Sequence, residues 1–232
     1  MTLFYAYFKN INDDWSYRYL AVFPSRDVAD EWWRAISATT NYAASVRRVT
    51  SQFYTHDSSK ALASTSLTDP KGTPQFLNQV FFTLLNDRDG RILSIAPRDY
   101  GRDLISGQTY YIRSKTSPSE YWYIPRSNSS SEVATSHQVT VSTTDRTLFR
   151  ITRTDANSDG TVMIKGDSVV LTDVVSGAAI SFGRDQVVIV NNPDGGNQGF
   201  QFGSFASGFR ADRFWDRIVK TDNGLGEAWE LV

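Results

Sequence analysis

Cysteine is absent from this sequence, and histidine occurs only twice, as His56 and His137. The lack of cysteine excludes disulfides, thiolate nucleophiles and zinc sites built on cysteine. A chain without cysteine suits a reducing compartment, so we expect a cytoplasmic protein. With so few imidazoles, acid–base catalysis by histidine has few options.

Positive charge is not in excess either. The chain carries 24 basic and 25 acidic residues, for a formal net charge of −1. Binding to a nucleic-acid backbone needs concentrated positive charge, so nucleic acid is not an expected partner. No run approaches the roughly 18 apolar residues of a membrane-spanning helix. We therefore expect no membrane insertion. The first nine residues lack the basic leader and apolar core of a signal peptide, which is a second reason to expect a cytoplasmic protein.

The common catalytic motifs are missing. The sequence has no Gly-x-Ser-x-Gly elbow, no phosphate-binding Gly-x-x-x-x-Gly-Lys loop, no Gly-x-Gly-x-x-Gly and no His-Glu-x-x-His. Each of these motifs places a nucleophile, a phosphate or a metal at a reacting centre. Their absence favours a binding protein over an enzyme, and no cofactor is expected.

The N-terminal part has the pattern of a small α+β unit. Aromatic and β-branched residues fill 3–8 and 15–23, with turn residues between them, and predict a hairpin. Helical spacing follows over about 26–38, where Ser25 is a suitable N-cap. Residues 44–54 then read as one strand. The order β-β-α-β predicts a unit over residues 1–55.

Two details of this unit bear on its surface. Trp32 and Trp33 lie about 100° apart on a helix, so one of them is expected to face the sheet. Arg47 and Arg48 form a short basic pair, which we interpret as a solvated edge rather than an anion site.

Residues 56–75 have no sustained periodicity, which predicts a linker or a surface loop. Beyond it, residues 76–232 contain many short strand patterns separated by turn residues, and they open with a hairpin over 79–95 whose turn is Asp89-Gly90. One of these strands is predicted over 213–219. Such spacing predicts an all-β domain, either a β-trefoil or, as the alternative, a β-sandwich or jelly roll.

Three segments favour the trefoil, because its repeated four-strand units tend to end on an apolar-polar-apolar strand. These segments are 148–151, 200–202 and 229–231. Against this, the Asp-Gly and Asn-Gly turns are unequally spaced, so the sequence alone does not demonstrate a three-fold repeat.

One loop matches the first half of a calcium site. Asp155, Asn157 and Asp159 alternate before Gly160, as oxygen ligands of a calcium loop do. The position of the bidentate glutamate, however, is Gly166. We therefore expect a turn without a metal ion, with these three residues as the weak metal candidates.

Aromatic residues among polar neighbours are the remaining signal. A pyranose ring stacks on Trp or Tyr while Asp and Asn bind its hydroxyls. The alternative is that the tryptophans belong to the core. The candidate ligand-binding residues are Tyr121, Trp122, Tyr123, Asn192, Asp194, Asp212, Trp215 and Asp216.

The cysteine-free composition, the Asn86-Asp-Arg-Asp-Gly-Arg91 turn and the ending Gly226-Glu-Ala-Trp-Glu-Leu-Val232 carry a resemblance. Residues 76–232 resemble the β-trefoil lectins and protease inhibitors of mushroom fruiting-body cytoplasm. The Gln-x-Trp signature of ricin-type lectin repeats is absent, so the sugar-binding positions of those repeats have no counterpart here. The resemblance implies a fungal defence protein that is either a lectin for glycans or a protease inhibitor acting through an exposed loop.

Overall fold

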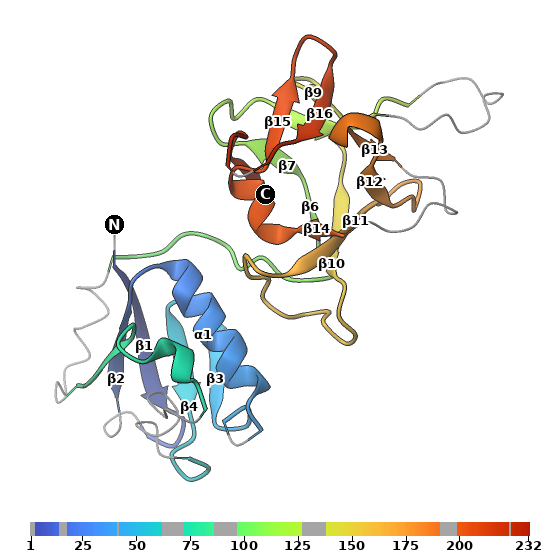
Figure 1. Ribbon diagram of the computed structural model, residues 1–232. Helices are drawn as coiled ribbons and strands as arrows, with labels where there is room; N and C mark the ends of the chain where they lie inside the picture. Colours follow the sequence, from blue (N-terminus) through green and yellow to red (C-terminus); the bar gives the residue numbers. More distant parts are fainter. Residues whose placement is uncertain are drawn as a thin grey trace. The chain divides into compact units, whose positions relative to one another are not determined.

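A computed structural model describes residues 3–13, 18–40, 42–61, 72–85, 97–126, 138–190, 199–222 and 224–232. The fold is mainly β with several sheets, which confirms the predicted fold class at this level. The chain divides into two compact units, Met1–Asp103 and Leu104–Val232 (Figure 1). The division therefore falls after Asp103, later than the 56–75 segment that the sequence indicated.

The first unit contains a five-stranded sheet in the order β3-β4-β1-β2-β5. Strands β1 and β4 run parallel and the other neighbours run antiparallel. The elements of this unit are β1 (Phe4–Asn10), β2 (Tyr19–Phe23), α1 (Arg26–Ala38), β3 (Val46–Thr50), β4 (Phe53–His56), η1 (Pro74–Phe76) and β5 (Phe81–Leu84).

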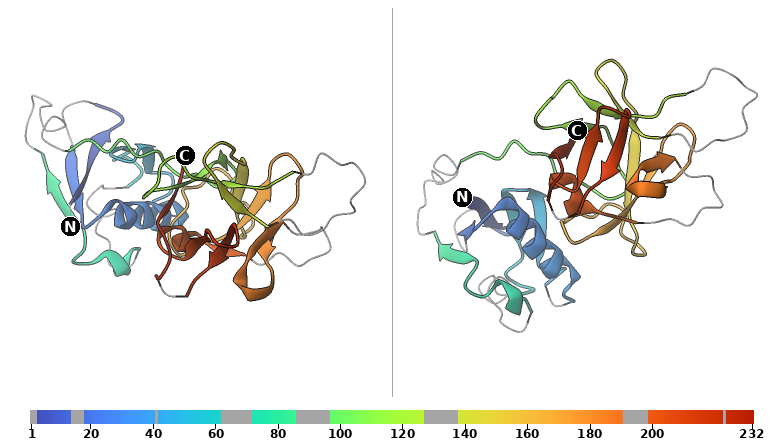
Figure 2. Two further views of the ribbon diagram at one scale, coloured as in Figure 1. Left: turned by 90° about the horizontal axis from the view of Figure 1, so that it is seen from above. Right: turned by 45° about the horizontal axis from the view of Figure 1, so that its top comes forward.

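Helix α1 has the bounds that the sequence predicted. Ser25 caps it, since its Oγ accepts a hydrogen bond from the Val28 N–H. The helix lies along one face of the sheet in each view (Figures 1 and 2). Trp32 is the tryptophan that faces the sheet: it is fully buried and meets the Phe8 ring edge to face at 5.6 Å between centroids. The predicted geometry of the two helical tryptophans is thus confirmed.

Two sequence predictions differ from the structure of this unit. Residues 44–54 form two strands, because the chain turns at Ser51 and Gln52 and β3 pairs back on β4. The described parts of 56–75 belong to the first unit and do not join the two units. Asp57 accepts hydrogen bonds from the Ser59 N–H and hydroxyl, and Phe76, just after this segment, is buried in the unit's apolar core.

Strand β5 also belongs to the first unit, although the sequence placed it at the start of the all-β domain. It pairs antiparallel with β2, joining Tyr19 to Leu84 and Val22 to Phe81. Its predicted hairpin partner falls within 86–96, which lies outside the described residues.

The second unit is built from short strands, mostly paired antiparallel with neighbours in sequence. Strand β17, at the end of the chain, pairs with β7 near the unit's start. Its elements are β6 (Thr109–Tyr110), β7 (Ile112–Ser114), β8 (Tyr121–Tyr123), β9 (Thr140–Ser142), β10 (Phe149–Arg153), β11 (Ser168–Asp173), β12 (Ile180–Phe182), η3 (Arg184–Gln186), β13 (Val188–Val190), β14 (Phe200–Gln201), η4 (Phe202–Ala206), β15 (Phe209–Asp212), β16 (Arg217–Lys220) and β17 (Trp229–Leu231).

An apolar core of its own holds this unit together. Trp122 lies in it without solvent exposure and contacts three other aromatic rings edge to face. Its ring centroid is 5.2 Å from that of Phe209, 5.8 Å from that of Trp229 and 6.3 Å from that of Phe149. These residues come from four different strands, so Trp122 joins the sheets.

In the described part of the chain, no helix has both the length and the apolar character that crossing a membrane requires.

The two tryptophans that sequence analysis treated alike should respond differently to truncation. We expect Trp122→Ala to lower the free energy of unfolding by about 3–5 kcal/mol, because it opens a large cavity in the core. Trp215→Ala removes a side chain that is 64% exposed and should change it by less than about 0.5 kcal/mol. Chemical denaturation of both variants beside the parent chain measures this. Equal losses would contradict the assignment of one tryptophan to core and the other to surface.

Candidate functional site

The β15–β16 hairpin carries the most exposed aromatic pair of the second unit. Asp212 and Arg217 form the last residue pair of the hairpin. Residues 213–216 form its loop, which lies between the strands labelled β15 and β16 in Figure 1. The sequence predicted a continuous strand over 213–219, which is wrong. The chain turns here because Asp216 adopts a positive φ of 49° and Asp212 bonds to the loop backbone.

Asp212 organises this loop. Its Oδ1 accepts hydrogen bonds from the Phe214 and Trp215 N–H groups, and its Oδ2 accepts one from Arg217 Nε at 3.2 Å. Partial burial acts to raise the pKa of Asp212, but the bonds from Arg217, Trp215 and Phe214 outweigh it, so the pKa lies below its ordinary value. The loop is therefore held by an ionised carboxylate at neutral pH.

Arg213 connects the loop to the rest of the unit. Its guanidinium donates to Glu227 Oε1 at 2.9 Å and to Glu120 Oε2 at 2.8 Å. These two carboxylates raise the pKa of Arg213. Glu120 begins the 120–124 aromatic cluster, so this contact brings together the two clusters that the sequence singled out.

The rings of the loop point into solvent. Phe214 is 83% exposed and Trp215 64% exposed, with the ring centroids 5.0 Å apart and the planes nearly perpendicular. The Arg217 guanidinium lies 6.0 Å from the centre of the Trp215 ring, which holds the indole from one side. Asp216 is exposed beside them, and no hydrogen bond to its carboxylate occurs among the described residues. We call residues 212–217 the aromatic loop. It offers two exposed aromatic rings, followed in the chain by an exposed carboxylate.

Trp122 does not belong to this surface. Its prediction as a ligand platform is wrong, because strand alternation in β8 points it into the core between its two neighbours. Tyr121 and Tyr123 lie on the opposite face of the strand and stay partly exposed. Tyr121 packs edge to face against Tyr111, and the Arg146 guanidinium lies over both rings.

Two other predicted residues, Asn192 and Asp194, lie outside the described residues, so their loop remains a prediction. The candidate metal loop is described. Asp155 and Asp159 are exposed there, and Asn157 adopts a positive φ of 58°. Arg153 pairs with the Asp155 carboxylate. Within the described ranges, no three His, Cys, Asp or Glu side chains gather as a metal ion would need.

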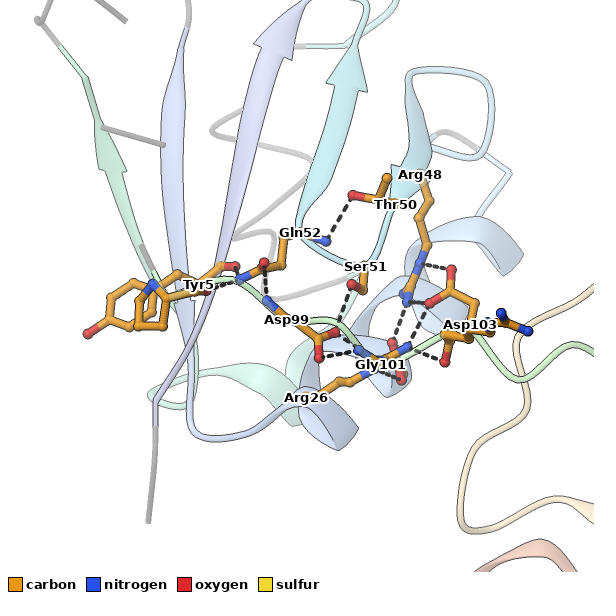
Figure 3. A network of polar contacts seen from close by, with 12 residues as sticks. Tyr5, Arg26, Arg48, Thr50, Ser51, Gln52, Asp99, Gly101 and Asp103 are labelled. Carbon is orange, nitrogen blue, oxygen red and sulfur yellow. Dashed lines mark hydrogen bonds and ion pairs between the residues drawn. The ribbon is translucent and has the colours of Figure 1, made fainter. Parts of the chain in front are cut away.

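The first unit contains a polar cluster that the sequence did not indicate (Figure 3). Residues 97–103 follow no regular secondary structure, and we call them the strap. The strap is bound by four residues of α1, β3 and the β3–β4 turn, which we call the cradle: Arg26, Arg48, Ser51 and Gln52. Asp99 accepts from Arg26 Nη1 at 2.7 Å and from Ser51 Oγ at 2.9 Å.

The second carboxylate of the strap, Asp103, is held by both arginines. It accepts from Arg48 Nη2 at 2.6 Å, from Arg48 Nε at 3.0 Å and from Arg26 Nη2 at 2.8 Å. The Arg48 fork is thus bidentate on this carboxylate, the strongest geometry for such a pair. The cradle thus binds two carboxylates that lie four residues apart in the chain.

Arg48 is the buried centre of this cluster, with a side chain 4% exposed. Burial acts to lower the pKa of Arg48, but Tyr54, Asp103 and Asp30 together raise it by more, so the net pKa is raised and the guanidinium stays charged. Asp30 accepts from Arg48 Nη2 at 2.7 Å and lies 3.5 Å from Arg26 Nε. Burial raises the pKa of Asp30, and the two arginines offset only part of that rise. Burial also raises the pKa of Tyr54, whose hydroxyl accepts from Arg48.

A scan of protein-family models finds no match to this sequence, and a search of the curated proteins finds no significant relative. The aromatic loop and the cradle with its strap are therefore the features from which a function can be inferred.

Removing Arg48 should destabilise the first unit selectively. Arg48→Met leaves Asp30 and Asp103 without their main partner, and we expect a loss of about 3 kcal/mol, the low end for a buried ion pair because Asp103 keeps some solvent. Arg47→Met, at the exposed neighbouring position, is the matched control. Hydrogen exchange of the β3 and β4 amides measures the loss. Equal protection in both variants would show that the Arg48 cluster contributes no net stability.

The 155–160 loop should not bind calcium. Arg153 occupies the Asp155 carboxylate, and the twelfth loop position is Gly166, so the ion would lack ligands. Calorimetric titration with calcium should give no heat of binding. Calcium binding at micromolar concentration that Asp159→Ala abolishes would contradict this prediction.

Proposed function

We propose that this chain is a non-catalytic, carbohydrate-binding protein of the lectin type, and that the aromatic loop binds a neutral saccharide. The observation that carries the proposal is the exposure of Phe214 and Trp215 on a loop whose backbone is fixed by Asp212. Adjoining apolar rings held in solvent are typical of a surface that binds a ligand or another molecule. A fixed loop also loses little conformational entropy when a ligand binds.

The chemistry of the loop suits a sugar ring. The exposed part of the Trp215 indole can cover the apolar C–H face of a pyranose. The exposed Asp216 carboxylate, which follows Trp215 in the chain, can accept hydrogen bonds from the hydroxyls. Flat stacking gives the affinity, and the carboxylate restricts which hydroxyl arrangement fits.

The charges around the loop favour a neutral ligand over a polyanion. Arg213 forms ion pairs with Glu120 and Glu227, and Arg217 forms an ion pair with Asp212. With Asp216 the loop surroundings hold more carboxylates than guanidiniums. An anionic glycan would have to displace an internal ion pair to reach an arginine, whereas a neutral sugar would not.

A β-trefoil second unit is part of this proposal. The three apolar-polar-apolar segments that favoured this fold lie within or overlap strands β10, β14 and β17. Phe149, Ile151, Phe200 and Trp229 from those strands all enter the same apolar core. The pairing of β17 with β7, which brings the end of the unit to its beginning, supports a closed arrangement of the repeats.

Single-site affinity should be weak. One stacking contact and a few hydrogen bonds, made in competition with water, give dissociation constants of roughly millimolar to micromolar. Useful binding to a cell surface then needs several sites or several copies of the chain, because avidity multiplies weak contacts.

The test is glycan-array screening followed by titration of any neutral sugar that binds. We expect Trp215→Ala to weaken binding at least about tenfold through loss of the stacking face, and Trp215→Phe to retain part of it. Leu225→Ala removes another exposed apolar side chain of the same unit, at 81% exposure, and should leave binding unchanged. Unchanged binding in folded Trp215→Ala would place the sugar elsewhere. Inhibition in a parallel protease panel, without any glycan binding, would replace the lectin function with the inhibitor function.

A further inference from the structure

The strap contacts the rest of the first unit as a bound peptide would. Its residues alternate: Asp99 and Asp103 face the cradle, while Arg98, Tyr100 and Arg102 are exposed. Tyr100 is 85% exposed. An extended segment that presents every second side chain to a surface is the usual geometry of peptide recognition.

The cradle also forms hydrogen bonds with the backbone of the strap. The Gln52 amide donates from Nε2 to the Pro97 carbonyl at 2.7 Å and accepts at Oε1 from the Asp99 N–H at 2.7 Å (Figure 3). Arg26 Nη2 donates to the Arg102 carbonyl at 2.9 Å. These bonds fix an extended chain whatever its side chains are, and the two carboxylates then supply the specificity.

Gly101 adds a steric requirement between the two carboxylates. A Cβ at this position would lie 2.3 Å from Arg26 Nη1, at the end of a flexible side chain, so the Arg26 guanidinium would have to shift and its bonds to Asp99 and Asp103 would be disturbed. The cradle therefore accepts Asp-x-Gly-x-Asp and disfavours a side chain at the central position.

Both arginines of the cradle also have partners outside the strap. Asp30 pairs with both of them, and the Tyr54 hydroxyl accepts from Arg48. Two guanidiniums share the single Asp30 carboxylate once the strap is subtracted. A cradle without its strap would thus keep these contacts and carry an uncompensated positive charge.

From this arrangement we infer that the cradle is a recognition site for acidic peptides of the Asp-x-Gly-x-Asp type, and that the chain's own strap occupies it. The strap acts as an internal competitor. Because it is covalently attached, its effective concentration is of the order of millimolar, and a free peptide at micromolar concentration does not displace it. The site opens to another acidic segment only when the strap leaves.

The test uses the full chain and a fluorescein-labelled peptide with the sequence of residues 97–103, Pro-Arg-Asp-Tyr-Gly-Arg-Asp. The parent chain should raise the peptide's anisotropy little. The double variant Asp99→Asn, Asp103→Asn should bind it at least about tenfold more tightly, since its strap has lost both charged contacts. A peptide with both Asp replaced by Asn, and one with Ala in place of Gly, should bind to neither chain.

Two further variants separate recognition from simple structural support. Gly101→Ala keeps both carboxylates but displaces the Arg26 guanidinium from them, so it should loosen the strap and bind the labelled peptide more tightly than the parent chain does. Adding Arg26→Gln to the double variant should abolish peptide binding; Arg26 suits this purpose because its side chain is 24% exposed and its loss is tolerated more easily than that of Arg48.

Circular dichroism establishes which of these variants are folded. The inference is overturned if the folded strap variants bind no labelled peptide, or if the parent chain binds it as tightly as they do. Saccharide binding by the second unit has no bearing on either outcome, because its predicted residues lie in a different unit.

Discussion

A permanently charged guanidinium held almost entirely out of water is the constraint on which the first unit depends. Arg48 cannot shed its proton, so every element around it has to supply an acceptor. Helix α1 supplies Asp30, strand β4 supplies the Tyr54 hydroxyl and the strap supplies Asp103. The positions of these three elements are coupled through one side chain.

The second unit depends on apolar packing instead of a buried charge. Its core is built from rings that pack edge to face around Trp122, with each contributing strand only a few residues long. Strands this short have few ladder hydrogen bonds, so shape complementarity between aromatic side chains carries much of the stability. The hairpin that bears Phe214 and Trp215 stands on this core: Phe209 and Ile218, in its two strands, are both fully buried.

What sequence reasoning could recover was the local part of the structure. The bounds of α1 followed from Ser25, whose capping bond spans three residues, and the mainly β class followed from the density of strand patterns. The same reasoning failed where a side chain's environment is set by distant residues. Trp122 and Trp215 both sit among polar neighbours, and only the strand alternation of β8 against the turn at Asp216 separates core from surface.

The cradle was beyond reach for the same reason. Arg26 and Asp99 are 73 positions apart, and Arg48 and Asp103 are 55 apart. An arginine pair beside a strand is ordinary on a solvated edge, which is how Arg47 and Arg48 were interpreted; this holds for exposed Arg47 but not for Arg48. The available signal was the Asp-x-Gly-x-Asp spacing itself, in which a glycine between two carboxylates indicates close approach to a cation.

The position of β5 at the edge of the first sheet has a kinetic consequence. Tyr19 pairs with Phe8 across a short connection, but with Leu84 only after most of the unit has been traversed. Closing the longer loop costs on the order of 1–2 kcal/mol more in chain entropy. Phe81 and Leu84 stay largely in solvent while Phe82 packs on the core against Tyr19 and Phe8, so β5 recovers only part of that cost through burial. This strand should therefore be the last of the sheet to join and the first to leave. Because the chain is fastened again at 97–103, a detached β5 remains tethered on both sides and re-pairs over a short search distance.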